Sequence, residues 1–520
     1  MTATPPEGAA KKTTLFDCLA LFFLGLFTYV NVFPNQFIYD DEMDIQRNAF
    51  IRDFSHLGQI FTSCVGAGSQ TPSNFYRPLQ NILYAVVYKI WGLDVFGYHL
   101  LNVTLHLSNA VLIYILFRKF SKSRFVALGT ALFFAVHPVE TEAVTLMNGI
   151  ADPLSVFFFL GALMFYQSEK TKAFTAAILF FILALLSKET AVVFSALFVL
   201  TDILQNKFTL SRWGRYATLA AVTGSYLAIR STSLNFTNSF NLFSTSNVYT
   251  EHLSYRFYTF LAALMDYWHV LLWPDRLMYD RPMTVYTTPF IPKVAISFIL
   301  LILILCVAVV SWRRNKILFC AVAWFFIPLI PVSGIIPING FVMEHWLYLP
   351  SVGFFFIAAT QIETIWKKFA PQKFSWQAAA LVILALPLGV RTWARNQDYR
   401  GPLSFYPLIL SYNPNIARIH NNLAMALDDA GQYKEAEDHY KAAMDLQKNL
   451  PQPHHNLGRL YLKEGKTNLA IEEFKEASDL DPNFPFSHAE LIKIYRADGN
   501  ETLARQEETA LQAILSKNDK

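Results

Sequence analysis

Runs of apolar residues recur from about residue 14 to residue 394, and the residues after them are mostly polar. A helix needs about 20 residues to cross a bilayer, and the runs predict twelve membrane segments, several of them shorter than this. The segments are 14–34, 97–117, 125–137, 151–167, 173–187, 190–204, 216–232, 257–273, 292–311, 317–336, 346–365 and 376–394. The first run follows Lys11 and Lys12 and has no small-residue cleavage site, so we expect a retained span and not a cleaved signal peptide.

Basic residues gather in short loops between the runs, which marks the cytoplasmic side of a membrane protein. The loops contain Lys11 and Lys12, Arg118 and Lys119, Lys122 and Arg124, Lys170 and Lys172, Lys207, Arg212 and Arg215, Arg313, Arg314 and Lys316, and Lys367, Lys368 and Lys373. Twelve full crossings cannot place all these loops on one side. Segment 257–273 is the weakest crossing because it carries Asp266 and His269. Without it, about eleven spans remain, and the loop after the first span and the C-terminal region both lie outside the cytoplasm.

Composition separates a membrane part from a soluble part. Hydrophobic residues make up 53% of the chain and charged residues 16%, whereas soluble domains carry about 25% charged residues. We therefore predict an all-α fold with a polytopic membrane domain at 1–396 and a soluble domain at 397–520. The net charge of +4 comes mostly from the loops between spans, so it predicts no nucleic-acid partner. The four cysteines form neither a disulfide framework nor a CxxC metal motif.

The C-terminal region repeats with a period of 34 residues. The recurring residues are His420, His454 and His488, Gly431, Gly465 and Gly499, and Ala436, Ala470 and Ala504. With Leu457-Gly458, Tyr461 and Phe474 in the middle repeat, this is the tetratricopeptide pattern, a helix–turn–helix that stacks into a solenoid. We predict repeats at 417–450, 451–484 and 485–518, after a partial repeat at 400–416. We expect packing roles for the repeat histidines, and a peptide or protein partner for the solenoid groove.

Two adjacent carboxylates, Asp40 and Asp41, follow the first predicted span. Ionisable groups are expensive near the membrane interior, and this makes them candidates for a functional site. One carboxylate can act as a general base towards a hydroxyl group. Its neighbour raises its basicity by repulsion between like charges, or else the pair holds a divalent metal ion. The sequence commits to no cofactor beyond this open alternative.

Short polar motifs occur in a fixed order ahead of the repeats. They are Tyr39-Asp40-Asp41 with Ile45 and Asn48, Tyr76-Arg77-Pro78-Leu79, Gly97-Tyr98-His99 with Asn102 and His106, His137-Pro138 with Glu140, Thr141 and Glu142, Gly149 with Asp152, Leu154 and Ser155, Ser187-Lys188-Glu189, and Glu344 before Leu347-Tyr348-Leu349-Pro350. In this order they resemble the TMTC family of transmembrane O-mannosyltransferases and its bacterial relatives, and more distantly the protein O-mannosyltransferases of the GT-C superfamily. The likeness runs from about Phe16 to the last repeat. One position departs from it, because the family usually has arginine after the glutamate where this chain has His345.

The resemblance implies a GT-C-type glycosyltransferase that moves a sugar, in this family mannose, from a polyprenyl-phosphate carrier to serine or threonine hydroxyls of proteins. The reaction would take place on the extracytoplasmic face, in a bacterial periplasm or the lumen of the endoplasmic reticulum. Asp40 is then the predicted base and Asp41 its partner. The leaving phosphate needs cations near the membrane surface, and we predict Arg77, Lys188 and Arg230 for this role. The predicted substrate-binding residues are His137, Glu140, Glu142, Glu344 and His345.

Structural roles remain open for several of these residues. Arg77 is also typical of a helix end at the interface, and the adjacent Lys188 and Glu189 are typical of an internal ion pair. His99 and His106 lie seven residues apart on one helical face, and we expect core histidines there and not a metal site. For the whole chain, the alternatives are a glycosyltransferase with a glycan or lipid acceptor and a non-enzymatic scaffold whose repeats gather partners.

Overall fold

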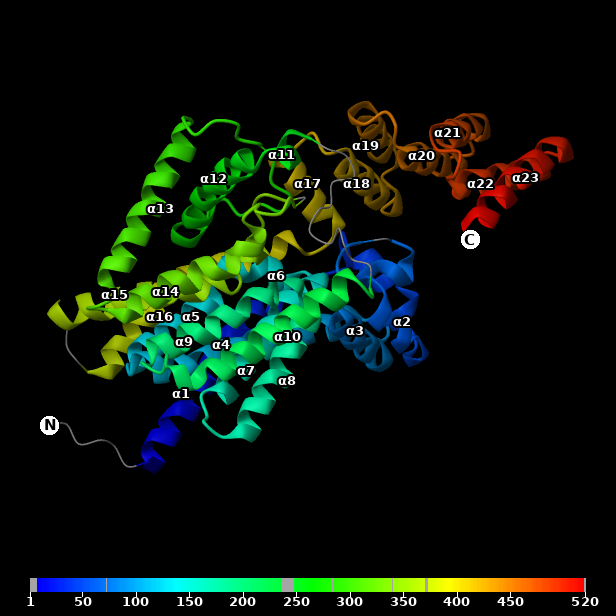
Figure 1. The fold of residues 1–520 in the computed structure, drawn as a ribbon. Helices are drawn as coiled ribbons and strands as arrows, with labels where there is room; N and C mark the ends of the chain where they lie inside the picture. The colour runs from blue at the N-terminus through cyan, green and yellow to red at the C-terminus, as the bar shows by residue number, and fades with distance from the viewer. Residues whose placement is uncertain are drawn as a thin grey trace. The chain divides into compact units, whose positions relative to one another are not determined.

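The computed structural model describes residues 7–71, 73–234, 247–282, 284–338, 340–369 and 373–518. Every regular element in these ranges is helical, as α-helix, 3-10 helix or a single π turn, which confirms the predicted all-α class. The chain divides into two compact units, residues 1–400 and 401–520. Each unit is described by itself (Figure 1).

A helix of the first unit covers most of each predicted apolar segment except 317–336, where the α-helix ends at Phe326 and a 3-10 helix, Ile327–Val332, follows. These helices are α1 Glu7–Tyr29, α4 Val95–Ser121, α5 Arg124–Val136, α7 Ala151–Tyr166, α8 Thr171–Ser187, α9 Phe194–Leu204, α10 Trp213–Ser231, α12 Leu253–Leu272, α13 Pro292–Ser311, α14 Lys316–Phe326, α15 Pro350–Phe369 and α16 Phe374–Asp398.

Five helical stretches are long and apolar enough to cross a membrane by length and composition. Within the described residues these are Lys12–Val32, Val95–Ser121, Met147–Tyr166, Pro292–Ser311 and Phe374–Asp398, and shorter apolar helices lie at Arg124–Val136, Thr171–Ser187 and Lys316–Val332. Helix α12 covers the segment expected to be the weakest crossing, and it belongs neither to the five long stretches nor to the shorter apolar helices. A multi-pass membrane protein is therefore supported, and the count of eleven spans stays a prediction.

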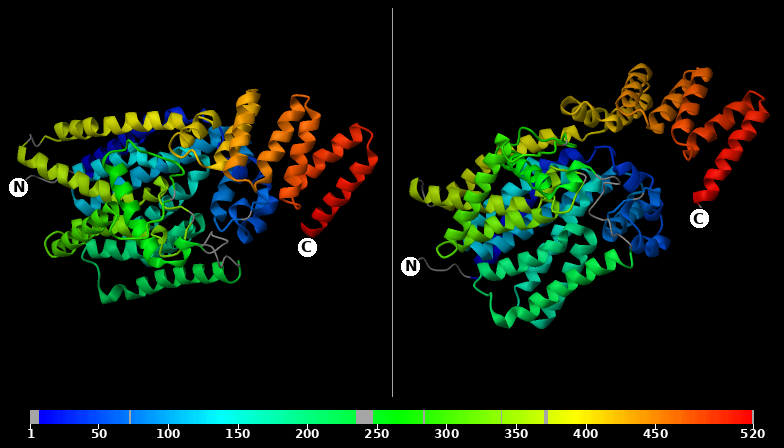
Figure 2. Two further views of the ribbon diagram at one scale, coloured as in Figure 1. Left: turned by 90° about the horizontal axis from the view of Figure 1, so that it is seen from above. Right: turned by 45° about the horizontal axis from the view of Figure 1, so that its top comes forward.

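Helix α4 packs against α1, α5 and α7, while α5 also packs against α15 and α16. Figure 2 shows this helical bundle from two further directions. The ring of Phe117 in α4 meets Trp324 of α14 and Phe356 of α15 edge-on, with ring centroids 5.7 and 4.7 Å apart. Such edge-to-face contacts add to the burial energy of the rings. Gly353 lets α15 approach α14 closely, because a Cβ atom there would lie 2.5 Å from the carbonyl oxygen of Ala321.

Asp17 joins the first helix to two others through a buried charge. Its carboxylate accepts a hydrogen bond from the hydroxyl of Tyr114 at 2.5 Å, and its two oxygens accept from Nε and Nη2 of Arg124 at 2.8 and 2.6 Å. A buried carboxylate is tolerated where it is paired and hydrogen-bonded in this way. The contact fixes α1 against α4 and α5.

The segment between the first two apolar runs folds into short helical turns and two helices, α2 Leu57–Thr62 and α3 Pro78–Trp91. The apolar runs did not predict α3, because polar side chains such as Gln80 and Asn81 interrupt its apolar pattern, although the structure buries them. A second short helix, α6 Thr141–Thr145, lies between α5 and α7. The first of these regions carries Asp40, Asp41 and Arg77 of the predicted site, and α6 carries Glu142.

The second unit begins with α17 Pro402–Tyr412 and continues as three helix pairs. The pairs are α18 Ala417–Asp429 with α19 Tyr433–Leu446, α20 Pro451–Lys463 with α21 Thr467–Leu480, and α22 Pro485–Ala497 with α23 Glu501–Asn518. The regular spacing of Gly431, Gly465 and Gly499 has a backbone cause, since each glycine follows the first helix of its pair and has a positive φ, of 77, 75 and 72° respectively. Glycine is the residue best suited to that left-handed position after a helix.

Each repeat histidine contacts a side chain 19 residues later, on the second helix of its own pair. His454 Nδ1 lies 2.8 Å from Glu473 and His488 Nδ1 lies 2.6 Å from Glu507. In the first pair the partner is a histidine, with Nδ1 of His420 and Nδ1 of the residue at 439 only 2.9 Å apart. The histidines thus link the two helices of a repeat.

We predict that replacing Gly458 with valine destabilises the repeats. A Cβ atom at this position would lie 2.8 Å from the ring of Phe474, and overpacking of this kind costs about 1–3 kcal/mol. Urea unfolding of a 401–520 fragment, followed by circular dichroism, measures the loss. The neighbouring exposed residue provides the control, because Arg459→Ala should change the unfolding free energy by no more than about 0.5 kcal/mol. Equal stability of the two variants would contradict the packing argument.

Candidate functional site

Asp40 and Asp41 have different surroundings although they are adjacent. Asp41 is fully buried, and its carboxylate accepts the backbone N–H of Ile38 at 3.1 Å and of Asn148 at 2.7 Å. Burial raises the pKa of Asp41 to about 7, against the opposing effect of these hydrogen bonds. Asp40 is exposed. Asp41 therefore fixes the loop in place, and Asp40 is the member of the pair that a ligand can reach.

A third carboxylate, Asp44, belongs to the same cluster and was not singled out from the sequence. Burial, the charge of Asp40 and the charge of Asp41 raise the pKa of Asp44 to about 8, while the nearby guanidinium of Arg77 lowers it. Asp44 follows Asp40 by four residues, within the turn Glu42–Gln46. That spacing, one helical turn, was the available signal.

The predicted cations Arg77, Lys188 and Arg230 lie around Glu189. Arg77 donates two hydrogen bonds to the carboxylate of Glu189, from Nε at 2.9 Å and from Nη2 at 2.6 Å. Burial opposes ionisation of this carboxyl group, but Arg77, with smaller contributions from Arg230 and Lys188, lowers the pKa of Glu189 to about 2. Arg77, the residue before α3, is thus the ion-pair partner of Glu189, while Arg230 of α10 and Lys188 act on Glu189 through their charge.

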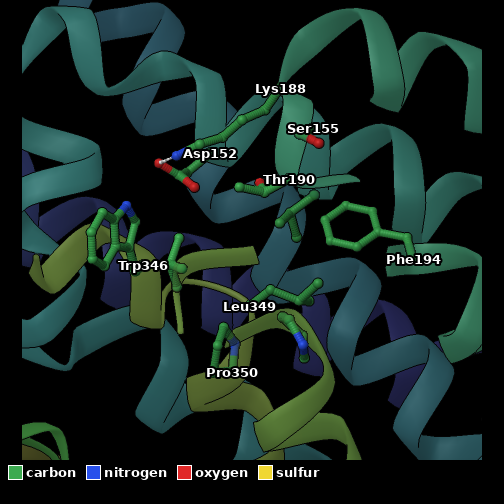
Figure 3. Close-up of a pocket in the computed structure, with 11 residues that line it drawn as sticks. Asp152, Ser155, Lys188, Thr190, Phe194, Trp346, Leu349 and Pro350 are labelled. Carbon is green, nitrogen blue, oxygen red and sulfur yellow. Dashed lines mark hydrogen bonds and ion pairs between the residues drawn. The ribbon is translucent and has the colours of Figure 1, made fainter. Parts of the chain in front are cut away.

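Lys188 forms an ion pair with Asp152, with its Nζ 2.5 Å from a carboxylate oxygen. The pair borders a cavity of about 20 Å³ that is also lined by Ser155, Thr190 and Trp346. Figure 3 shows Lys188 reaching Asp152, with Trp346 on the side of Asp152. The cavity has room for about one water molecule, so a larger ligand needs the surrounding side chains to move. Asp152 lies in one of the ordered motifs but was not predicted as a site residue.

Arg230 is almost fully buried. Its Nη2 donates to the carbonyl oxygen of Asn74 at 2.7 Å and its Nη1 to the hydroxyl of Tyr226 at 3.0 Å. These contacts tie the end of α10 to the segment before Arg77. Arg230 therefore positions the segment that carries Arg77, in addition to its electrostatic effect on Glu189.

Glu142, Glu344 and His345 form a second cluster. One oxygen of Glu142 lies 2.5 Å from Nδ1 of His345, and the other accepts the backbone N–H groups of Glu344 at 2.8 Å and His345 at 3.2 Å. Glu344 accepts the backbone N–H of Met278 at 2.6 Å and lies 3.7 Å from Arg395. Burial raises the pKa of Glu344 to about 7, against the effect of Arg395.

The other predicted substrate-binding residues have separate surroundings. His137 accepts the backbone N–H of Val139 on Nδ1 at 3.1 Å and begins a 3-10 turn, and its ring packs against Phe355. Glu140 is fully buried, and burial raises its pKa well above the usual value. Both belong to the turn that leads from α5 into α6. Nε2 of His137 also lies 3.3 Å from the carbonyl oxygen of Leu271 in α12, and within the described residues neither side chain is hydrogen-bonded to His345.

Among the described residues, no group of three or more His, Cys, Asp or Glu side chains is placed to hold a metal ion. Both oxygens of Asp41 already accept backbone hydrogen bonds. His99 and His106 are fully buried and make separate contacts, with the carbonyl oxygen of Asn35 and the hydroxyl of Tyr348 respectively. The donor set therefore does not fit a metal at the acidic pair.

The raised pKa of Asp41 predicts a pH-dependent stability. A folded-state pKa of about 7, against an ordinary 3.8, means that the folded chain holds the proton more tightly than the unfolded chain. This contribution is complete below about pH 4 and is lost as the pH rises towards 7. The melting temperature of Asp41→Asn should therefore rise relative to that of the wild type as the pH increases from 5 to 8. A constant difference between the two proteins across this range would contradict the burial argument.

A tetratricopeptide-repeat family model matches residues 415–483. The match covers the first two predicted repeats and confirms that this region is a tetratricopeptide solenoid. The third helix pair, α22 with α23, follows the matched residues with the same spacing.

Curated relatives match most of the chain. A protein O-mannosyl-transferase of Caenorhabditis elegans is 26% identical over 85% of this chain and 64% of its own length. Tmtc3 of Drosophila melanogaster is 25% identical over 85% of this chain and 56% of its own length, and human TMTC3 is 26% identical over 79% and 49%. The chain thus spans from about half to just under two thirds of the length of these relatives.

A solved structure, ArnT from Cupriavidus metallidurans bound to undecaprenyl phosphate, aligns over 92% of this chain and 81% of its own with 14% identity and a TM-score of 0.41. The family resemblance therefore rests on the sequence relatives and not on this solved structure. The resemblance to the TMTC protein O-mannosyltransferases, predicted from the ordered motifs, is confirmed by sequence similarity to several members of that family.

Proposed function

We propose that the chain is a membrane glycosyltransferase that transfers mannose from a polyprenyl-phosphate carrier to serine or threonine hydroxyls of protein acceptors on the extracytoplasmic face. The observation that supports this most is the gathering of Asp40, Asp44 and Arg77 in one cluster with Glu189 and Lys188. A membrane anchor does not need such a cluster, because buried charge is expensive and is kept mainly where it has a function. The named activity of the relatives agrees with it.

Asp40 is the base in this proposal. The acceptor hydroxyl oxygen attacks C1 of the mannosyl group, the bond between C1 and the phosphate oxygen breaks, and the hydroxyl proton passes to the carboxylate of Asp40. Attack opposite to the leaving phosphate inverts C1. Asp41 and Asp44 lie beside Asp40, and the charge of Asp40 is one of the causes that raise the pKa of both carboxyl groups.

The leaving phosphate needs positive charge near the site of bond breaking. Arg77 and Lys188 carry that charge, each neutralised in the free protein by a carboxylate, Glu189 and Asp152 respectively. A phosphate that binds beside them shares their donors with these anions. Paired cations of this kind keep fixed positions, which favours pre-organised binding.

The solenoid presents the acceptor. Its histidines and aromatic residues support the repeats from within, as the contacts of His454 and His455 show. Solenoid surfaces bind extended segments of other proteins. The chemistry is therefore assigned to residues 1–400 and the selection of acceptor to residues 401–520.

Replacement of Asp40 by asparagine should reduce mannosyl transfer by about 10²–10⁴-fold, because a general base contributes a factor of this size. Binding of the lipid-linked donor should remain. The measurement is the initial rate of transfer to a serine-containing peptide, with donor binding measured in parallel. Glu42→Gln is the matched control, since Glu42 lies two residues away and pairs with Arg47, and it should keep near-normal transfer. Normal turnover by Asp40→Asn would remove Asp40 from the mechanism.

Removal of residues 401–520 should separate the enzyme from the scaffold alternative. The truncated chain keeps Asp40, Arg77, Lys188 and Arg230, so it should still bind and slowly hydrolyse the lipid-linked sugar while losing transfer to a folded protein. Mass spectrometry of the acceptor and thin-layer analysis of the lipid measure the two activities. A stable truncated chain that binds no lipid-linked sugar, beside isolated repeats that keep all partner binding, would favour the scaffold. Transfer to glycan or lipid acceptors alone would favour the other enzymatic alternative.

A further inference from the structure

The turn Glu42–Gln46, which follows the acidic pair, is a π turn. Turns of this kind are rare, and many of them lie at functional sites. The backbone N–H of Asp44, inside the turn, donates to the carbonyl oxygen of Asp40 at 2.9 Å. The conformation of the turn therefore determines where the backbone of Asp40 lies.

The C-terminal end of the turn has carbonyl groups that a longer helix would have paired. Side chains take the place of those partners. Nδ2 of Asn48 donates to the carbonyl oxygen of Asp44 at 3.0 Å. Nη2 of Arg52 donates to the carbonyl oxygen of Ile45 at 3.1 Å and also to that of Gln46. One guanidinium nitrogen thus holds the last two carbonyl groups of the turn.

Arg52 is in turn fixed by α3. Its guanidinium carbon lies 4.3 Å from the centroid of the Tyr88 ring, a distance at which a cation and an aromatic ring attract each other. Tyr88 belongs to α3, and α3 begins directly after Arg77. Arg52 therefore joins the acidic turn to the helix that has one of the predicted phosphate cations at its N-terminal end.

Arg52 is not part of the charge cluster of the site. Arg77 is the cation whose charge acts on Asp44, whereas the hydrogen bonds of Arg52 go to carbonyl oxygens of the backbone. The nearby Arg47 differs again, because its side chain is 56% exposed and pairs with the carboxylate of Glu42. Removal of Arg52 therefore loosens the turn and leaves the charged groups of the site in place.

We infer that Arg52 is a positioning residue that holds the acidic turn against α3 and thereby sets the position of Asp40 relative to Arg77. The inference rests on the proposed function, in which Asp40 takes the proton of the acceptor and Arg77 faces the leaving phosphate. Without Arg52, two carbonyl groups at the end of the turn lose their partner. A shift of about 1 Å at a catalytic group can lower a rate by about 10²-fold. Donor binding depends less on the turn, because the predicted phosphate cations lie outside it.

Steady-state transfer by the full chain tests this role, with a polyprenyl phosphomannose as donor and a serine-containing peptide as acceptor. The value of kcat is expressed per donor-binding site, so that unfolded chains do not count. Arg52→Ala should lower kcat by about 10–100-fold, while the KM for the donor stays near its wild-type value. Arg52→Lys keeps the charge and a donor group for the two carbonyl oxygens, and it should recover part of the lost kcat.

Hydrogen–deuterium exchange reports on the turn independently of activity. The amide of Asp44, which donates to Asp40, should exchange faster in Arg52→Ala than in the wild type and at an intermediate rate in Arg52→Lys. Arg47→Ala is the matched control, because it removes an exposed arginine whose ion pair contributes little. It should keep the wild-type kcat and the wild-type exchange of the Asp44 amide.

Wild-type kcat and exchange in Arg52→Ala would overturn the inference, as would a loss confined to the KM for the donor. If Arg52→Ala does not fold, Tyr88→Leu replaces it, because this variant removes the ring beside the guanidinium and should lower kcat to a smaller extent. Wild-type kcat in both Tyr88→Leu and Arg52→Lys would then overturn the inference. A wild type without any transfer would instead overturn the proposed function, and exchange of the Asp44 amide would still test how Arg52 holds the turn.

Discussion

Buried backbone outside helices must have its polar groups hydrogen-bonded, and the site of this protein depends on how that requirement is met. Water is scarce beside a membrane bundle, so an unpaired carbonyl oxygen is costly. Asparagine side chains on α4 provide the donors. Nδ2 of Asn102 donates to the carbonyl oxygen of Leu146 at 2.7 Å and Nδ2 of Asn109 to that of Pro153 at 2.8 Å. These bonds fix the chain that supplies the N–H of Asn148 to Asp41.

The same kind of side chain holds the other irregular segments. Asn48 and Asn81 both donate to the carbonyl oxygen of Val65, at 3.3 and 3.1 Å, and Asn35 and Asn396 link the first loop to the end of α16. An amide can both donate and accept without carrying charge, so it satisfies backbone groups with no desolvated ion. Neutral amide contacts thus hold the segments around the loop of Asp40, in addition to the backbone hydrogen bonds that the carboxylate of Asp41 accepts.

The conformation of the backbone, and not adjacency in the sequence, decides which charged residues pair. This limits what the sequence could predict. Apolar runs and a period of 34 residues are local signals, and they predicted the helices and the repeats. Lys188 and Glu189 are neighbours and suggest a pair with each other. Lys188 however has an extended backbone, with φ −154° and ψ 136°, and successive side chains then point to opposite sides. Lys188 reaches Asp152, while Glu189 reaches Arg77, 112 residues away in sequence.

The second cluster shows the same limit over a longer separation. Glu142 and His345 are 203 residues apart, and both were predicted as substrate-binding residues only through separate motifs. Their pairing depends on the path of the turn before α15, where the backbone N–H groups of Glu344 and His345 both point at Glu142. A turn of that shape has no simple sequence signature. Motif order thus named the residues of the cluster, and the tertiary structure decided which of them meet.

The turn at Tyr39 connects these two clusters. Tyr39 has a positive φ of 56°, a left-handed backbone that costs a residue other than glycine about 1–2 kcal/mol. Its ring meets that of Tyr279 edge-on, with centroids 5.2 Å apart, and the residue before Tyr279 donates its N–H to Glu344. The strained turn directly precedes Asp40, which is exposed, and Asp41, which is buried. Strain of this kind persists only where surrounding contacts determine the conformation, and here those contacts come from the acidic loop on one side and from the Glu344 segment on the other. A change in either cluster therefore acts on the position of Asp40.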